Sequence, residues 1–149
     1  MKKNSQNPDV FESELTLTFS NDHDGIMFID GNVYSGSQFK LNRYAPEYGY
    51  KKLLLQNVKK KSGSWYEQSF KNSDNFIFRI RSIVKDEKFQ KALHGKIIGP
   101  IRFYPARSKL TAIIEFQYHL NPDYTRNLEF DLKRNLFGNL PTLEQVKDP

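Results

Sequence analysis

Hydrophobic and polar residues alternate along most of this chain, and the alternation predicts β-strands rather than helices. Leu15, Leu17 and Phe19 are separated by hydroxyl residues, the period of two that places successive side chains on opposite faces of a strand. The clearest strand signal runs over 110–120. There one face holds Leu110, Ala112, Ile114, Phe116, Tyr118 and Leu120, and the other holds Thr111, Glu115, Gln117 and His119.

Clusters of turn residues separate these apolar segments at a spacing of about 8–15 residues. The strongest are at 21–25, 30–32, 35–37 and 121–123. This punctuation is typical of antiparallel sheets and not of strand–helix–strand units. We therefore predict an all-β, mostly antiparallel β-sandwich of about 8–10 short strands, Ig-like or jelly-roll, with a barrel as the alternative.

The pattern leaves two alternatives at 82–95. One is a hairpin that turns at Asp86-Glu87-Lys88, and the other is a short helix ended by Gly95. The hairpin is favoured because the flanking pattern has period two and a short helix is marginal alone. Farther along, Gly99-Pro100 predicts a kink or bulge within a strand. One residue, Ile77, falls on the same strand face as the arginines that follow it.

The 149 residues suit one domain, and 14% aromatic content argues against a disordered chain. We expect a disordered leader over 1–10, a single sandwich domain over 11–138, and a tail or linker over 139–149. The first seven residues are charged and polar with no apolar segment behind them, so they do not form a signal peptide. No apolar run approaches the roughly 20 residues of a membrane helix. The mix of Asn, Tyr and short strands nevertheless favours a secreted or cell-surface domain whose signal has been removed.

Positive charge is concentrated in one region of the chain. Residues 79–109 contain nine Lys and Arg against Asp86 and Glu87, in a chain whose formal net charge is +6. Basic residues mixed with aromatics suit a strand face that binds nucleic acid or another polyanion. The candidate basic face consists of Arg79, Arg81, Lys96, Arg102 and Arg107. The alternative is an ordinary solvent-exposed strand face.

Aromatic residues in loops give the better candidate for binding. They are Tyr44, Tyr48, Tyr50, Trp65 and Tyr66. An exposed ring offers an apolar platform to a sugar, or an anchor at a protein interface, where Tyr, Trp and Arg are enriched. The alternative is that these rings close the ends of the core.

Patterns for catalysis and metal binding are weak. The chain has no cysteine, no Gly-x-Ser-x-Gly and no glycine-rich phosphate loop. Residues 20–25 resemble the start of a calcium loop, but Gly31 occupies the place of the required Glu. Asp22, Asp24 and Asp30 would gather around calcium or simply form a turn. The three histidines share no zinc-ligand spacing. We therefore name no catalytic residue, metal or cofactor.

These observations favour a non-catalytic binding module that presents aromatic loops and a basic face to a glycan or protein partner. A polyanion-binding β-domain is the alternative, and a small-ligand barrel or hydrolase comes third. Glu115, Glu129 and Asp131 are the strand-borne acids that a glycosidase would use, although cross-strand pairing with Lys or Arg explains them equally well.

Overall fold

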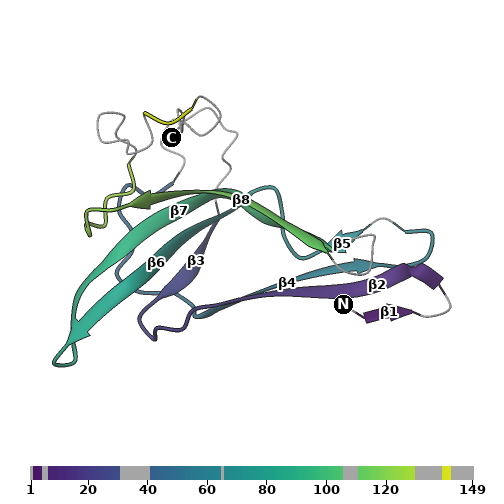
Figure 1. Cartoon of the computed structure of the whole chain (residues 1–149), viewed down its shortest axis with the longest axis horizontal. Helices are drawn as coiled ribbons and strands as arrows, with labels where there is room; N and C mark the ends of the chain where they lie inside the picture. The colour runs from purple at the N-terminus through teal and green to yellow at the C-terminus, as the bar shows by residue number, and fades with distance from the viewer. Residues whose placement is uncertain are drawn as a thin grey trace.

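The computed structural model describes residues 2–4, 7–30, 41–64, 66–105, 111–129 and 139–141, which form eight strands in two antiparallel sheets (Figure 1). Sheet 1 has the order β1 (Lys2–Asn4), β2 (Asn7–Thr18), β4 (Leu53–Lys60), β5 (Glu67–Gln68). Sheet 2 has the order β3 (Gly25–Asp30), β6 (Asp74–Lys85), β7 (Lys88–Pro105), β8 (Ala112–Asn121). The described ranges contain no helix that is long and apolar enough to cross a membrane.

The predicted all-β, sandwich-like class is confirmed, and the two sheets do not close into a barrel. The N-terminal boundary differs from the sequence-based prediction, because strands occupy residues 2–4 and 7–10 of the expected disordered leader. β1 folds back on β2, with Lys3 opposite Phe11. Backbone groups form this pairing, so a polar segment joins the sheet without needing an apolar side chain.

The hairpin alternative at 82–95 is also confirmed. Lys85 lies opposite Lys88, and the two residues between them form a tight turn. Asp86 and Glu87 both have positive φ, 51° and 59°, the backbone that two-residue hairpin turns require. Residues 82–95 therefore follow the period-two pattern of the flanking strands and not the helical spacing within the segment.

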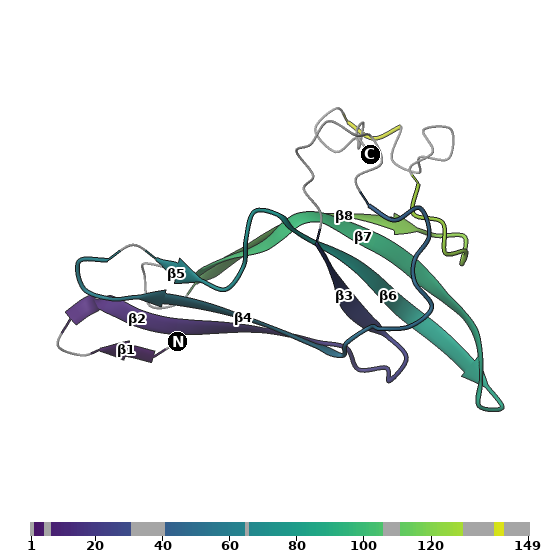
Figure 2. The same ribbon diagram turned by 180° about the vertical axis from the view of Figure 1, so that it is seen from behind.

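The core lies between the inner faces of the two sheets (Figure 2). Sheet 2 contributes Ile26, Phe76, Phe78, Ile97 and Ile101, and sheet 1 packs Leu15, Leu17 and Leu54 against them, together with Phe19. A neighbouring cluster joins Val58, Phe70 and Phe103. Burial of these apolar surfaces is the main favourable contribution to folding.

A third layer covers the outer face of sheet 2. Residues 43–46 and 126–129 run side by side there, with the Ala45 N–H donating to the Arg126 carbonyl (2.7 Å) and the Leu128 N–H to the Arg43 carbonyl (2.9 Å). Ala45 and Leu128 bury Ile77 completely. This layer explains why an isoleucine occurs on the arginine-bearing face of β6.

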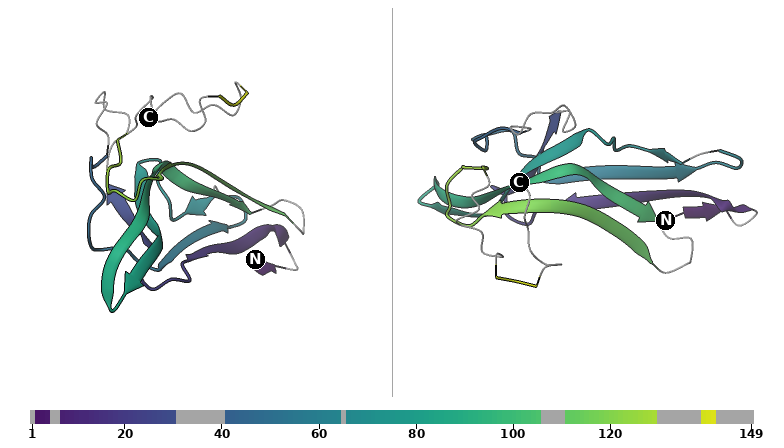
Figure 3. Two further views of the ribbon diagram at one scale, coloured as in Figure 1. Left: turned by 60° about the vertical axis from the view of Figure 1, so that its left-hand side comes forward. Right: turned by 90° about the horizontal axis from the view of Figure 1, so that it is seen from above.

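The C-terminal half of β7 lies over sheet 1, where Phe103 packs on Val58, and β8 runs along the outer side of β7 (Figures 1 and 3). A bulge bends β7: Ile98 pairs with Gln117 and Arg102 with Glu115, so three residues of β7 lie opposite Phe116 alone. Gly99 within the bulge has a φ of 82°, which glycine adopts without steric cost. The prediction of a kink or bulge at Gly99-Pro100 is confirmed.

Candidate functional site

The most unusual surface of the described residues is the edge strand β8. It pairs with β7 on one side, and no strand of the described ranges pairs with its other side. The other edge strands are shorter: β1 has 3 residues, β5 has 2 and β3 has 6, against 10 in β8. Seen from above, β8 follows the border of the molecule for most of its length (Figure 3). A long strand edge presents unpaired backbone donors and acceptors to a partner.

Large apolar side chains of β8 are exposed on this edge. Ile113, Ile114, Phe116, Tyr118 and Leu120 are each between 37% and 59% exposed. Scattered single apolar residues are ordinary on a protein surface, but a continuous patch is the mark of an interaction site. The edge strand therefore combines unpaired backbone with apolar side chains, the two features that a binding strand would use.

Four of these side chains extend the core-facing surface of sheet 2. Tyr118 lies opposite Ile97, and Leu120 lies opposite Gly95. The Tyr118 ring meets the buried Phe78 ring edge to face, with 6.4 Å between centroids. The buried sheet 2 residues under sheet 1 all belong to β3, β6 and β7. Sheet 1 thus leaves the β8 end of the inner face uncovered.

Polar residues on the opposite face of β8 pair with basic residues of β7. Glu115 lies opposite Arg102, and His119 lies opposite Lys96. Burial lowers the pKa of Lys96, and burial followed by the nearby Lys96 charge lowers the pKa of His119. Glu115 is the only carboxylate on β8, and its cross-strand neighbour is the cation Arg102.

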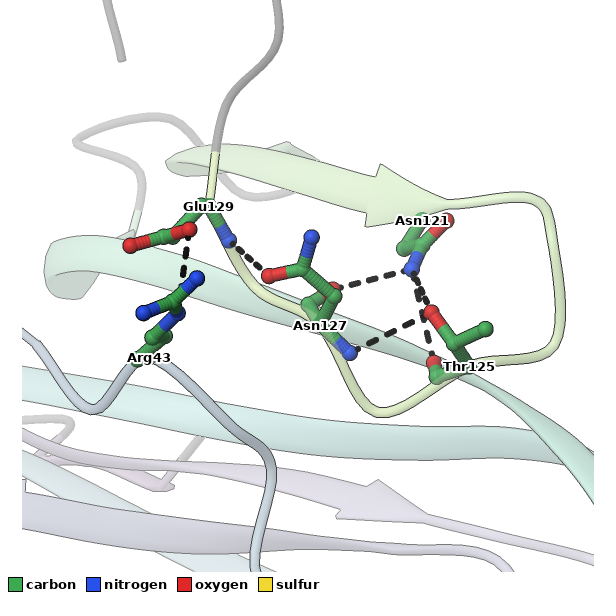
Figure 4. A network of polar contacts seen from close by, with 5 residues as sticks. All are labelled: Arg43, Asn121, Thr125, Asn127 and Glu129. Carbon is green, nitrogen blue, oxygen red and sulfur yellow. Dashed lines mark hydrogen bonds and ion pairs between the residues drawn. The ribbon is translucent and has the colours of Figure 1, made fainter.

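A network of polar contacts holds the chain immediately after β8 (Figure 4). The Asn121 side-chain amide donates to the Thr125 hydroxyl and to the Asn127 carbonyl, both at 2.9 Å. The Glu129 N–H donates to the Asn127 side chain (3.1 Å), and Arg43 forms an ion pair with Glu129 (3.2 Å). These contacts tie the C-terminal end of β8 to the third layer.

The described residues of the predicted aromatic set lie outside the strands, in the segment before β4 and just before β5. Tyr50 is half-buried in the third layer, where its hydroxyl donates to the Pro46 carbonyl (2.9 Å) and burial raises its pKa to about 12. Tyr48 is 81% exposed, and Tyr44 lies beside Arg43. Tyr66 instead contacts Phe11 and Lys60 of sheet 1. Trp65 lies outside the described residues.

The predicted basic face is partly used in holding the fold together. Arg79 stacks on the Tyr50 ring (4.4 Å from guanidinium carbon to centroid) and donates to the His23 and Glu47 carbonyls. Lys96 is half-buried on the same face of sheet 2, whereas Arg81 lies in a bulge and Arg102 lies beyond the Gly99 bend. Arg107 lies outside the described residues. The structure therefore does not gather these residues into one row.

The calcium-like turn at 20–25 supports the β6 bulge. The Asp24 carboxylate accepts from the Arg81 and Ser82 amides, both at 2.9 Å. Asp22 forms an ion pair with Lys52, which lowers the Asp22 pKa. Within the described ranges no three His, Cys, Asp or Glu residues gather as metal ligands.

Comparison of the chain with protein-family models, with curated protein sequences and with solved structures finds no match. The candidate site therefore depends on geometry alone. Sequence reasoning identified β8 as a strand but did not identify it as an edge. The available signal was Ile113, an apolar residue on the polar face, because apolar residues on both faces indicate more contact than one buried face requires.

Proposed function

We propose that this chain is a protein-binding module that takes up a β-strand of its partner along β8. The observation that supports the proposal is the 10-residue edge strand with five exposed large apolar side chains. Strand addition obtains affinity from main-chain hydrogen bonds and specificity from alternate side chains. The proposal keeps the protein-partner half of the expectation from sequence and moves the site from the tyrosine-rich loop to β8.

Glycan binding has weaker support from the described residues. A sugar site needs an exposed ring together with hydrogen-bonding groups that are free to bind hydroxyls. Tyr48 is exposed, but Tyr50 and Arg79 are engaged with each other and with backbone carbonyls. Polyanion binding has the same weakness, since Arg79 serves the fold and Lys96 is half-buried. A strand partner uses none of these groups.

The experiment is a selection of strand-forming decapeptides from a displayed library on the immobilised chain. A selected peptide should shift the backbone amide resonances of residues 112–121 in a ¹⁵N-labelled sample. Phe116→Lys should weaken peptide affinity at least tenfold, because charged side chains on an edge strand oppose strand pairing. Leu55→Lys is the matched control, since Leu55 is similarly exposed (47%) but belongs to sheet 1.

Circular dichroism of both lysine variants should match the unmodified chain, which separates lost binding from lost folding. Equal peptide affinity in Phe116→Lys would contradict the proposal, as would amide shifts centred on Tyr48. A glycan array and a salt titration with heparin test the two alternatives in parallel. Polyanion binding would weaken steeply as salt rises.

A further inference from the structure

We propose that the strand which pairs with β8 is β8 of a second copy, so that two chains form a twofold dimer through a continuous eight-stranded sheet. This inference rests on the proposed function and names its partner. In the part of the chain that the structure describes, sheet 2 has four strands and ends at β8, so pairing two β8 strands antiparallel would join two such sheets edge to edge. A twofold axis makes the same surface serve both partners.

The side-chain sequence of β8 is self-complementary about Phe116. With Phe116 opposite its own copy, Ile114 lies opposite Tyr118 and Ala112 lies opposite Leu120. Every residue of the core-facing side, from Ala112 to Leu120, then has an apolar partner. Aromatic and β-branched pairs of this kind stabilise neighbouring antiparallel strands. A register centred one residue later leaves Ala112 without a partner.

Charge favours the same register. β8 contains a single carboxylate, Glu115, and no Lys or Arg. Centring on Phe116 places Glu115 opposite Gln117, whereas centring on Glu115 would place two carboxylates opposite each other. Like charges directly opposite in a sheet are destabilising. The strand is therefore free of charge repulsion along its length in the proposed register.

The net charge of the whole chain gives the dimer a distinct salt dependence. Each copy carries a formal charge of +6, so two copies repel at long range, and salt screens that repulsion. Self-association should stay constant or strengthen as salt rises. Polyanion binding would show the opposite trend.

Sedimentation velocity over a concentration series of the unmodified chain is the first measurement, with a concentration-dependent dimer as the expected result. Phe116→Lys and, as a second variant, Ile114→Lys should each raise the dimer dissociation constant at least tenfold. Leu55→Lys should leave it within a factor of two. An unmodified chain that remains monomeric at every concentration, or that dimerises equally in both β8 variants, would overturn the proposal.

The absence of cysteine allows a direct test of register. Phe116→Cys places two thiols opposite each other at the twofold axis, within the Cα separation that a disulfide spans. Glu115→Cys is the control. In this register the two 115 positions lie diagonally across the strand pair, with their Cα atoms roughly 8 Å apart, which is beyond that separation. Mild oxidation should link Phe116→Cys chains and not Glu115→Cys chains; linkage only in the latter would contradict the register.

The dimer and the strand-binding function fail in distinguishable ways. If the chain is monomeric and Phe116→Cys does not cross-link, but selected peptides still shift the amides of 112–121, the second copy is the wrong partner and the function stands. If the peptides also bind away from β8, the function itself is wrong.

Discussion

Single side chains of this protein hold backbone positions that the sheets alone would leave strained. In β6, Arg81 has a φ of 54° and interrupts the pairing with β7 between Ile80 and Ile83. Asp24 accepts from the two amides of this bulge, Arg81 and Ser82. A residue from the turn before β3 thus supplies the acceptors that β7 does not provide.

We expect Asp24→Ala to lower the free energy of unfolding by about 2–4 kcal/mol, because it removes two charge-assisted hydrogen bonds and leaves two amides without their acceptor. Urea denaturation measures the change. Asp22→Ala is the control, since the exposed Asp22–Lys52 ion pair is a surface contact of small value. Equal losses in the two variants would show that Asp24 has no special role.

The residue scale also shows where sequence reasoning was limited. The turn chemistry of 20–25 is visible in the sequence, and the period-two pattern indicated the strands around Leu15 and Phe116. Glu129, expected on a strand, instead lies in the third layer outside any strand. What Asp24 binds was not visible, because Ser82 is 58 residues away along the chain. The same limit applies to Tyr50 and Arg79. Their residue types suggested ligand binding, but in the structure Arg79 stacks on the Tyr50 ring and the Tyr50 hydroxyl donates to the Pro46 carbonyl.

At the scale of elements, the β6–β7–β8 meander depends on one close approach. Gly95 lies between Phe78 on β6 and Leu120 on β8. A Cβ at Gly95 would fall 2.2 Å from the Phe78 ring and 2.5 Å from the His119 carbonyl oxygen. The Phe78 ring therefore covers the glycine, and from there it reaches the Tyr118 ring at the edge.

Gly95→Ala should accordingly lower the free energy of unfolding by about 1–3 kcal/mol, the range for overpacking a filled site. The displaced Phe78 ring should also disturb Tyr118, so binding at the β8 edge should weaken together with stability. Gly63→Ala is a useful comparison: a Cβ at Gly63 meets no atom, and the cost there comes only from its φ of 70°. Chemical denaturation and the amide spectrum of β8 measure both effects. An unchanged β8 spectrum in Gly95→Ala would refute the coupling.

The edge position of β8 shows why the candidate site was only half predictable. Alternation along 110–120 indicates a strand with one apolar face, and the described part of that strand has one. Whether such a face is covered depends on how far sheet 1 extends, and no local pattern encodes that extent. The exposed apolar edge is a property of the assembled sheets.

For the molecule as a whole, the interface between sheet 2 and the third layer contains a buried histidine. Burial lowers the pKa of His94 from its ordinary 6.5, and the charges of Arg79 and Arg126 lower it further, although a backbone hydrogen bond to Thr125 opposes the shift. His119 on the neighbouring strand shifts in the same direction. Both imidazole rings therefore bind a proton less readily in the folded chain than in the unfolded chain.

Stability should therefore fall on mild acidification. Below pH 6.5 the unfolded chain binds protons at these histidines while the folded chain does not, so the free energy of unfolding is at its full value above pH 6.5 and declines as the pH falls toward the lower folded-state pKa values. Urea denaturation at about pH 7.5 and about pH 5 measures the decline. His94→Gln should reduce it, and the exposed His23→Gln should not. The same decline in His94→Gln as in the unmodified chain would assign the pH dependence to other groups.

The third layer has a consequence for synthesis on the ribosome. Ile77 must wait for Leu128, which the ribosome adds 51 positions later in the chain, roughly 3–10 s at ordinary translation rates. During that interval the Ile77 surface of β6 lacks its Leu128 cover, and it is available to any chaperone that binds apolar strands. Slowing elongation between codons 77 and 128 would lengthen this exposure without changing a single residue of the finished protein.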